Sequence, residues 1–135
     1  MKKLRGYISS REWNGSRAPQ HIQNIVLRDY CKNKNYEYLL SATEYAMENC
    51  FLILNELINN LSDIDGIVAY SLFQMPADNY YRSSVFQSFL SKGKEIHFAC
   101  ERLSITKQDE VARIEKIILV EKVLPRCLDG LNYHG

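Results

Sequence analysis

Residues 65–72 are the sequence feature that most restricts the fold. The run Asp-Gly-Ile-Val-Ala-Tyr-Ser-Leu is nearly all apolar, begins with an Asp-Gly pair and is followed by polar residues before Pro76. A continuous run of β-branched and aromatic residues is typical of a strand buried on both faces, as at the centre of a parallel sheet. Ser71 and Gln74, just after it, are then expected at the carboxyl edge of the sheet, where open α/β folds bind ligands.

Length and charge indicate a globular protein without a nucleic-acid or membrane partner. The 135 residues suffice for one domain, 1–135, that buries roughly two-thirds of its unfolded surface. The net charge is +1 and the charged residues are scattered. No run is long enough to span a bilayer, and residues 1–3 lead into a strand rather than a signal core, so we expect a cytoplasmic location. The four separate cysteines, without a C-x-x-C pair, predict buried thiols rather than disulfides or metal ligands.

Strand and helix patterns alternate up to residue 105. We predict strands over residues 5–9, 36–40, 65–72 and 95–100, and helices over residues 19–33, 49–61 and 77–91. This alternation predicts a three-layer α/β fold with a four-stranded parallel sheet. The order 2-1-3-4 of flavodoxin-like sheets places the switch point between the first and third strands. The apolar residues of the first helix that are expected to face the sheet are Ile22, Ile25, Val26, Tyr30 and Cys31.

A final helix is predicted over residues 106–125, beyond the 1–105 sheet core. Thr106 is suited to cap its start, Pro125 is expected to end it, and residues 126–135 are expected to form a loose tail. Apolar residues cover more of this helix than a narrow stripe. Either burial within the monomer or pairing with a second copy would cover them, and we predict a symmetric homodimer.

Polar side chains gather at the predicted carboxyl edge. Because parallel strands end at one edge, the loops after them and the start of the first helix should meet there. A helix N-terminus with nearby arginines attracts anions, although these arginines could instead pair with Glu12 or Glu44. The residues expected to bind substrate are Ser9, Ser10, Arg11, Arg17, Gln20, Thr43, Ser71 and Gln74.

His21 and Glu44 are the candidates for moving a proton in this pocket. The competing interpretation of His21 is an ordinary residue at the rim of a helix. No pair of histidines has metal-binding spacing with a carboxylate, and neither G-x-G-x-x-G nor G-x-x-x-x-G-K-[ST] occurs. We therefore predict no metal and no cofactor.

The layout resembles the catalytic domain of serine recombinases, the resolvases and invertases. The similarity lies in residues 6–9, 23–31 and 65–72, and the final helix stands where those proteins form their dimer. This chain departs from their Y-x-R-x-S motif, because Ser9 stands at the arginine position and Arg11 at the serine position. Gln74 and Ala77 replace the paired arginines that follow their third strand. Without those guanidinium groups DNA strand exchange is not expected.

A second resemblance, to the sporadic carbohydrate cluster protein family, spans the chain to about residue 105. It is carried by the strings at residues 6–8, 14–15, 19–21, 23–24, 28–31, 40–47 and 63–68. This resemblance implies a role in surface-polysaccharide or O-antigen biosynthesis and supplies no catalytic residues. Two hypotheses follow: a protein that acts on or binds a phosphorylated or nucleotide-linked sugar, or a non-catalytic scaffold or regulatory protein of a glycan-biosynthesis complex.

Overall fold

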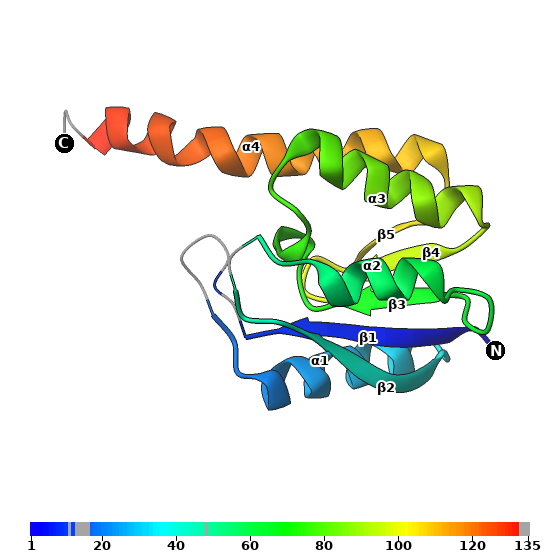
Figure 1. Cartoon of the computed structure of the whole chain (residues 1–135). Coiled ribbons are helices and arrows are strands. Elements are labelled where there is room, and N and C mark those ends of the chain that lie inside the picture. Colours follow the sequence, from blue (N-terminus) through cyan, green and yellow to red (C-terminus); the bar gives the residue numbers. More distant parts are fainter. Residues whose placement is uncertain (11, 13–16, 48, 133–135) are drawn as a thin grey trace.

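The chain alternates strands and helices, as Figure 1 shows for the computed structural model, which describes residues 1–10, 12, 17–47 and 49–132. In chain order the elements are β1 Lys3–Ser9, α1 Gln20–Asn33, β2 Glu37–Glu44, α2 Leu52–Asn59, β3 Gly66–Ala69, the 3₁₀ turn η1 Leu72–Gln74, α3 Asn79–Ser91, β4 Glu95–Phe98, β5 Leu103–Ile105 and α4 Gln108–Asn132. The predicted α/β class is confirmed.

Within the described residues the sheet has five strands in the order β2-β1-β3-β4-β5. β1 pairs in parallel with β2 and β3, and β3 pairs in parallel with β4, so the predicted order of the first four strands is confirmed. The prediction of only four strands was wrong, because β5 pairs antiparallel with β4. β5 has three residues and follows a turn in which Arg102 adopts a φ of 54°. Such a short strand shows no recognisable alternation in the sequence.

Helices cover both faces of the sheet, and β3 supplies side chains to each side. Val68 contributes to the core beneath α1, whereas Ile67 and Ala69 contribute to the core shared with α2, α3 and α4. Figure 1 shows α1 on the face opposite α2 and α3. All four residues of β3 are buried, which explains the continuous apolar sequence Gly66–Ala69 within the predicted strand over residues 65–72.

The face of α1 that packs on the sheet differs from the predicted stripe. Gln23 and Leu27 are fully buried with Tyr30 and Cys31, whereas Ile22 and Ile25 are exposed. The helix is rotated about its own axis relative to the prediction, because the amide of Gln23, rather than an aliphatic side chain, fixes its first turn against the sheet. Hydrophobic periodicity in the sequence does not predict a buried polar side chain that fixes a helix in this way.

α4 is the longest helix of the described residues, with 25 residues, and it runs past Pro125 to Asn132. The sequence analysis ended it at Pro125 and expected a loose tail from residue 126. Residues 126–132 are helical instead, and residues 133–135 lie outside the described ranges. A proline lacks one N–H donor, and the turns on either side keep their own bonds, so a helix can continue through it. Neither α4 nor another helix in the described ranges has the length and apolarity that a membrane crossing needs.

Candidate functional site

The switch point between β1 and β3 is occupied by Gln23, whose side chain is fully buried. Its Nε2 donates hydrogen bonds to the carbonyl oxygens of Ser9, at 2.6 Å, and Ala18, at 2.8 Å. Its Oε1 accepts a hydrogen bond from the backbone N–H of Ser9 at 3.2 Å. One side-chain amide therefore joins the end of β1, the chain entering α1 and α1 itself.

Gln74 completes this arrangement from the other side of the switch point. Its Nε2 donates to Oε1 of Gln23 at 2.9 Å, and its Oε1 accepts from the backbone N–H groups of Tyr70, at 3.1 Å, and Ser71, at 3.3 Å. Gln74 is also buried. Gln23 and Gln74, named here the glutamine pair, connect the carboxyl ends of β1 and β3 through their own amides.

A carboxylate lies beside the glutamine pair. Glu101 accepts a hydrogen bond from Oγ of Ser71 at 2.8 Å and another from the backbone N–H of Leu72 at 2.9 Å. The hydroxyl of Ser71 in turn accepts from the backbone N–H of Phe73 at 3.2 Å. Ser71 therefore serves η1 as its capping residue, and a phosphate brought to it would meet a negative charge.

Glu44, predicted as a proton carrier, is buried at the end of β2 and binds the start of α2. Its Oε1 accepts from the backbone N–H groups of Tyr45 and Ile53, each at 3.1 Å, and its Oε2 accepts from Leu54 N–H at 3.0 Å. The hydroxyl of Tyr7 donates to the same Oε2 at 2.9 Å. With these four donors, the Glu44 carboxylate has a structural role, in which it joins the end of β2 to the N-terminus of α2.

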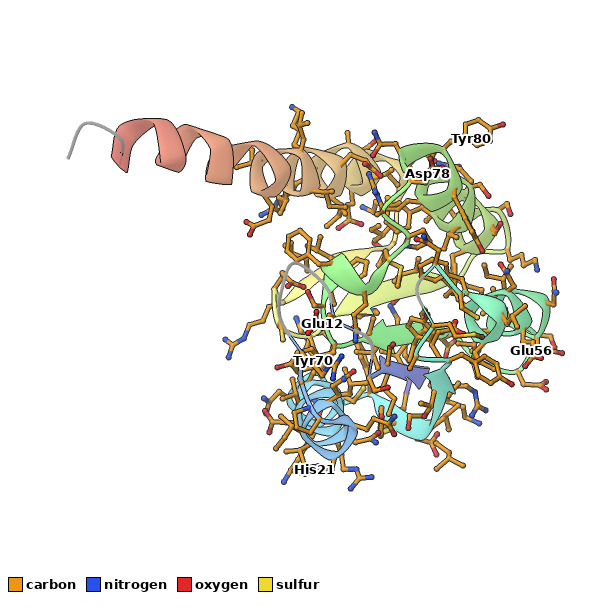
Figure 2. The ribbon with its side chains drawn as sticks, turned by 60° about the vertical axis from the view of Figure 1, so that its left-hand side comes forward. Glu12, His21, Glu56, Tyr70, Asp78 and Tyr80 are labelled. Carbon is orange, nitrogen blue, oxygen red and sulfur yellow. The ribbon has the colours of Figure 1, made fainter. Side chains whose placement is uncertain are left out.

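The remaining predicted residues are spread over the surface. Arg17 is exposed and lies 3.8 Å from Glu12, and Gln20 and His21 are exposed on the first turn of α1. Figure 2 shows His21 on the outer side of α1, away from Tyr70 at the carboxyl edge. Ser10 is half-buried, Thr43 is exposed, and Arg11 lies outside the described residues. The structure thus brings Ser9, Ser71 and Gln74 together. Glu44 lies beside Ser9 in the β1–β2 pairing, but its carboxylate is bonded to the start of α2, and His21 lies apart on α1.

Arg82 is a buried charge that the sequence analysis did not assign. Its guanidinium donates from Nε and Nη2 to the two carboxylate oxygens of Glu115 on α4, at 3.0 and 2.5 Å. Nη1 donates to the carbonyls of Pro76 and Ala77. A usable signal was present, because Arg82 shares its helical stripe with the buried Val85, Phe86 and Phe89.

A second buried polar group is His97, in the layer between the sheet and α1. Its Nδ1 lies 2.7 Å from the Tyr30 hydroxyl and its Nε2 lies 2.8 Å from Oε1 of Glu95. Burial lowers the pKa of His97, against the opposing pull of Glu95, and burial raises the pKa of Tyr30 to about 12. The partners therefore favour a neutral imidazole that donates from Nε2 to Glu95 and accepts from Tyr30. Lys2 binds the other oxygen of Glu95.

Among the residues that the structure describes, no three His, Cys, Asp or Glu side chains gather in a way that would hold a metal ion.

The fold is that of the catalytic domains of resolvase-type recombinases. The N-terminal catalytic domain of TP901-1 integrase superposes with a TM-score of 0.69 at 15% sequence identity, over 95% of this chain and 99% of that one. A resolvase family site-specific recombinase from Streptococcus pneumoniae superposes with a TM-score of 0.60 at 11% identity, over 96% of this chain and 99% of that one. At such identities the likeness concerns the fold alone.

No protein-family model and no curated protein matches the chain. The expected membership of the sporadic carbohydrate cluster family, and the function that it implies, therefore stay predictions.

Proposed function

We propose that this protein is a dimeric binding protein with the recombinase fold that performs no chemistry at the carboxyl edge of its sheet. The observation that carries the proposal is the glutamine pair. Gln23 and Gln74 lie where open α/β folds bind ligands, yet both amides are buried and satisfied by each other and by the backbone. A ligand entering there would have to break these hydrogen bonds.

The charges near the glutamine pair support the same proposal. Glu101 holds a carboxylate against Ser71, and a transferred phosphoryl group needs positive groups around it instead. Within the part of the chain that the structure describes, the hydrogen bonds of the glutamine pair involve amides and backbone groups and no arginine. Glu44, the predicted carboxylate for proton transfer, is already bonded to four donors.

The proposed dimer uses α4. Its first half packs on its own domain through Val111, Ile114 and Ile118. Figure 1 shows the helix continuing beyond the sheet and the other helices. Leu119 and Val120 are 60% and 58% exposed at the point where it leaves the domain. A helix that projects into water gains its stability from packing against a partner, and a second copy supplies the same apolar face by symmetry.

The carbohydrate pathway implied by the family resemblance is retained in this proposal. The protein would bind a phosphorylated or nucleotide-linked sugar as a regulatory or assembly factor. The competing function is an enzyme that acts on such a sugar at the carboxyl edge.

Incubation of the purified protein with UDP-glucose or glucose 1-phosphate separates these two functions. Phosphorus NMR would follow the substrate, and thermal unfolding would follow binding. We expect a raised melting temperature without any new phosphorus signal. Turnover that is lost in Ser71→Ala or Gln74→Ala would overturn the proposal in favour of the enzyme.

A further inference from the structure

A polar groove lies between α1 and the edge strand β2, on the side of α1 away from the glutamine pair. Its volume is about 490 Å³. It is lined by His21, Asn24, Ile25, Arg28, Tyr38, Leu40 and Ser41. Four of these residues come from α1 at spacings of three and four, so they form one stripe of the helix. This stripe includes the exposed Ile25, which the sequence analysis had assigned to the core.

The floor of the groove is Tyr38, held in a fixed position. A Cβ atom at Gly6 of β1 would lie 2.3 Å from the Tyr38 hydroxyl, so the absence of a side chain at Gly6 is what lets Tyr38 lie across β1. The Tyr38 hydroxyl donates to Oδ1 of Asn24 at 2.7 Å. Because that bond engages the oxygen of the amide, the NH₂ group of Asn24 is left to donate to a ligand.

The groove is rich in donors, and none of the described residues that line it is acidic. The Arg28 guanidinium lies 5.7 Å from the centre of the Tyr38 ring. None of the ion pairs formed within the described residues includes Arg28. His21 adds a ring nitrogen and Ser41 a hydroxyl that also hydrogen-bonds the Tyr38 side chain, while Ile25 and Leu40 leave apolar surface exposed beside the aromatic ring. An arginine, amide and hydroxyl donors and an aromatic face suit a small anion that carries hydroxyl groups and an apolar ring face.

We propose that this groove binds a phosphorylated sugar, with the phosphate on Arg28 and the sugar against Tyr38. Asn24 and Ser41 would hydrogen-bond the sugar hydroxyls, and His21 would lie at the end nearest the start of α1. The inference rests on the proposed function in one respect only, that the ligand is bound and not turned over. It moves the ligand from the carboxyl edge to the opposite side of α1.

Calorimetric titration with glucose, galactose and mannose 1-phosphates, with inorganic phosphate and with glucose tests this inference. We expect at least one hexose 1-phosphate to bind more tightly than inorganic phosphate or glucose. Arg28→Gln should weaken that binding roughly tenfold or more, because it removes a charge-assisted bond. Asn24→Ala should weaken it without altering the affinity for inorganic phosphate. Lys32→Ala, an exposed substitution on the same helix that does not line the groove, should leave it unchanged.

Several results would overturn the inference. One is that no hexose 1-phosphate binds, and another is that inorganic phosphate binds as tightly as the hexose 1-phosphates. A third is that Arg28→Gln keeps full affinity while its circular dichroism matches that of the parent protein. Binding that depends on Arg28 but is accompanied by turnover would contradict the proposed function and leave the groove assignment standing.

Discussion

Gln74 donates a hydrogen bond from its Nε2 to Oε1 of Gln23 at 2.9 Å, and this single contact joins the ends of the two central strands. Gln23 belongs to α1 and Gln74 to η1, 51 positions further along the chain. Both side chains are removed from water, so each amide depends on the other and on backbone groups for its partners. At the switch point the glutamine pair therefore has a structural role: it forms a joint between the ends of β1 and β3.

Replacing Gln23 tests this joint. Gln23→Ala removes the hydrogen bonds that the Gln23 amide makes with the backbone of Ser9, the carbonyl of Ala18 and the buried Nε2 of Gln74, so we expect a loss of about 2–4 kcal/mol in the free energy of unfolding. Urea unfolding measures the change. Gln20→Ala, an exposed substitution on the same helix, should alter stability by less than about 0.5 kcal/mol. Equal stabilities for the two variants would show that the joint contributes nothing.

Glu44→Ala is expected to act on stability through α2. The substitution removes the acceptor for two backbone N–H groups at the start of that helix, for the backbone N–H of Tyr45 just after β2 and for the Tyr7 hydroxyl. Loss of such a cap, together with a buried hydroxyl left unpaired, should cost about 2–3 kcal/mol in thermal or urea unfolding. Glu37→Ala at the exposed start of the same strand is the control. A variant as stable as the parent protein would reject this role for Glu44.

Arg82 and Glu115 should be among the most sensitive positions of the chain. Glu115→Ala leaves the guanidinium of Arg82, which is 2% exposed, without its carboxylate partner. We expect a loss of about 3–5 kcal/mol, the range for breaking one side of a buried pair. Arg113→Ala, exposed on the same helix, should be nearly neutral. If Arg82→Met proves as damaging as Glu115→Ala, the hydrogen bonds to the carbonyls of Pro76 and Ala77 also contribute.

His97 should make stability depend on pH. Its pKa is lowered in the folded protein from an ordinary value of 6.5, because burial disfavours the charged ring. Below about pH 6.5 the unfolded chain therefore binds a proton that the folded protein does not, and the free energy of unfolding falls as the pH decreases. Above that pH the contribution of the neutral ring is fully present. Unfolding at pH 7.5 and 5.5 should show this loss in the parent protein.

The pH comparison needs two variants. His97→Phe should lose part of the difference between the two pH values, whereas His21→Ala, exposed on α1, should keep it. An identical pH dependence in the parent protein and in His97→Phe would rule out this effect of His97.

The sequence predicted the fold better than the site. The apolar run that contains Ile67 and Val68 and the alternation of strands and helices are enough to define the central parallel strands, because burial on both faces requires such a run. The end of the helix predicted over residues 77–91 also agrees with α3, and Gly93, just after it, has a φ of 70° that suits a helix end.

The site could not be predicted in the same way, because its key residues look like surface residues in a sequence. Gln23 and Arg82 are polar, yet both are buried by specific partners far along the chain, Gln74 and Glu115. Glu44 lies next to the carboxyl edge, as expected, but its hydrogen bonds to α2 depend on the loop between β2 and that helix. The topology of the sheet was enough to place Glu44 near the carboxyl edge. Its structural role depends on hydrogen-bond partners that no local sequence pattern specifies.

The proposed dimer is tested most directly by the mass of the protein in solution. Light scattering at high micromolar concentration should give twice the 15.7 kDa of one chain. The double variant Leu119→Glu and Val120→Glu should give the mass of one chain, because it places charges on the exposed apolar face of α4. Asp109→Asn at the start of the same helix should remain dimeric. A parent protein that stays monomeric at this concentration would contradict the dimer, and a double variant that stays dimeric would place the interface elsewhere.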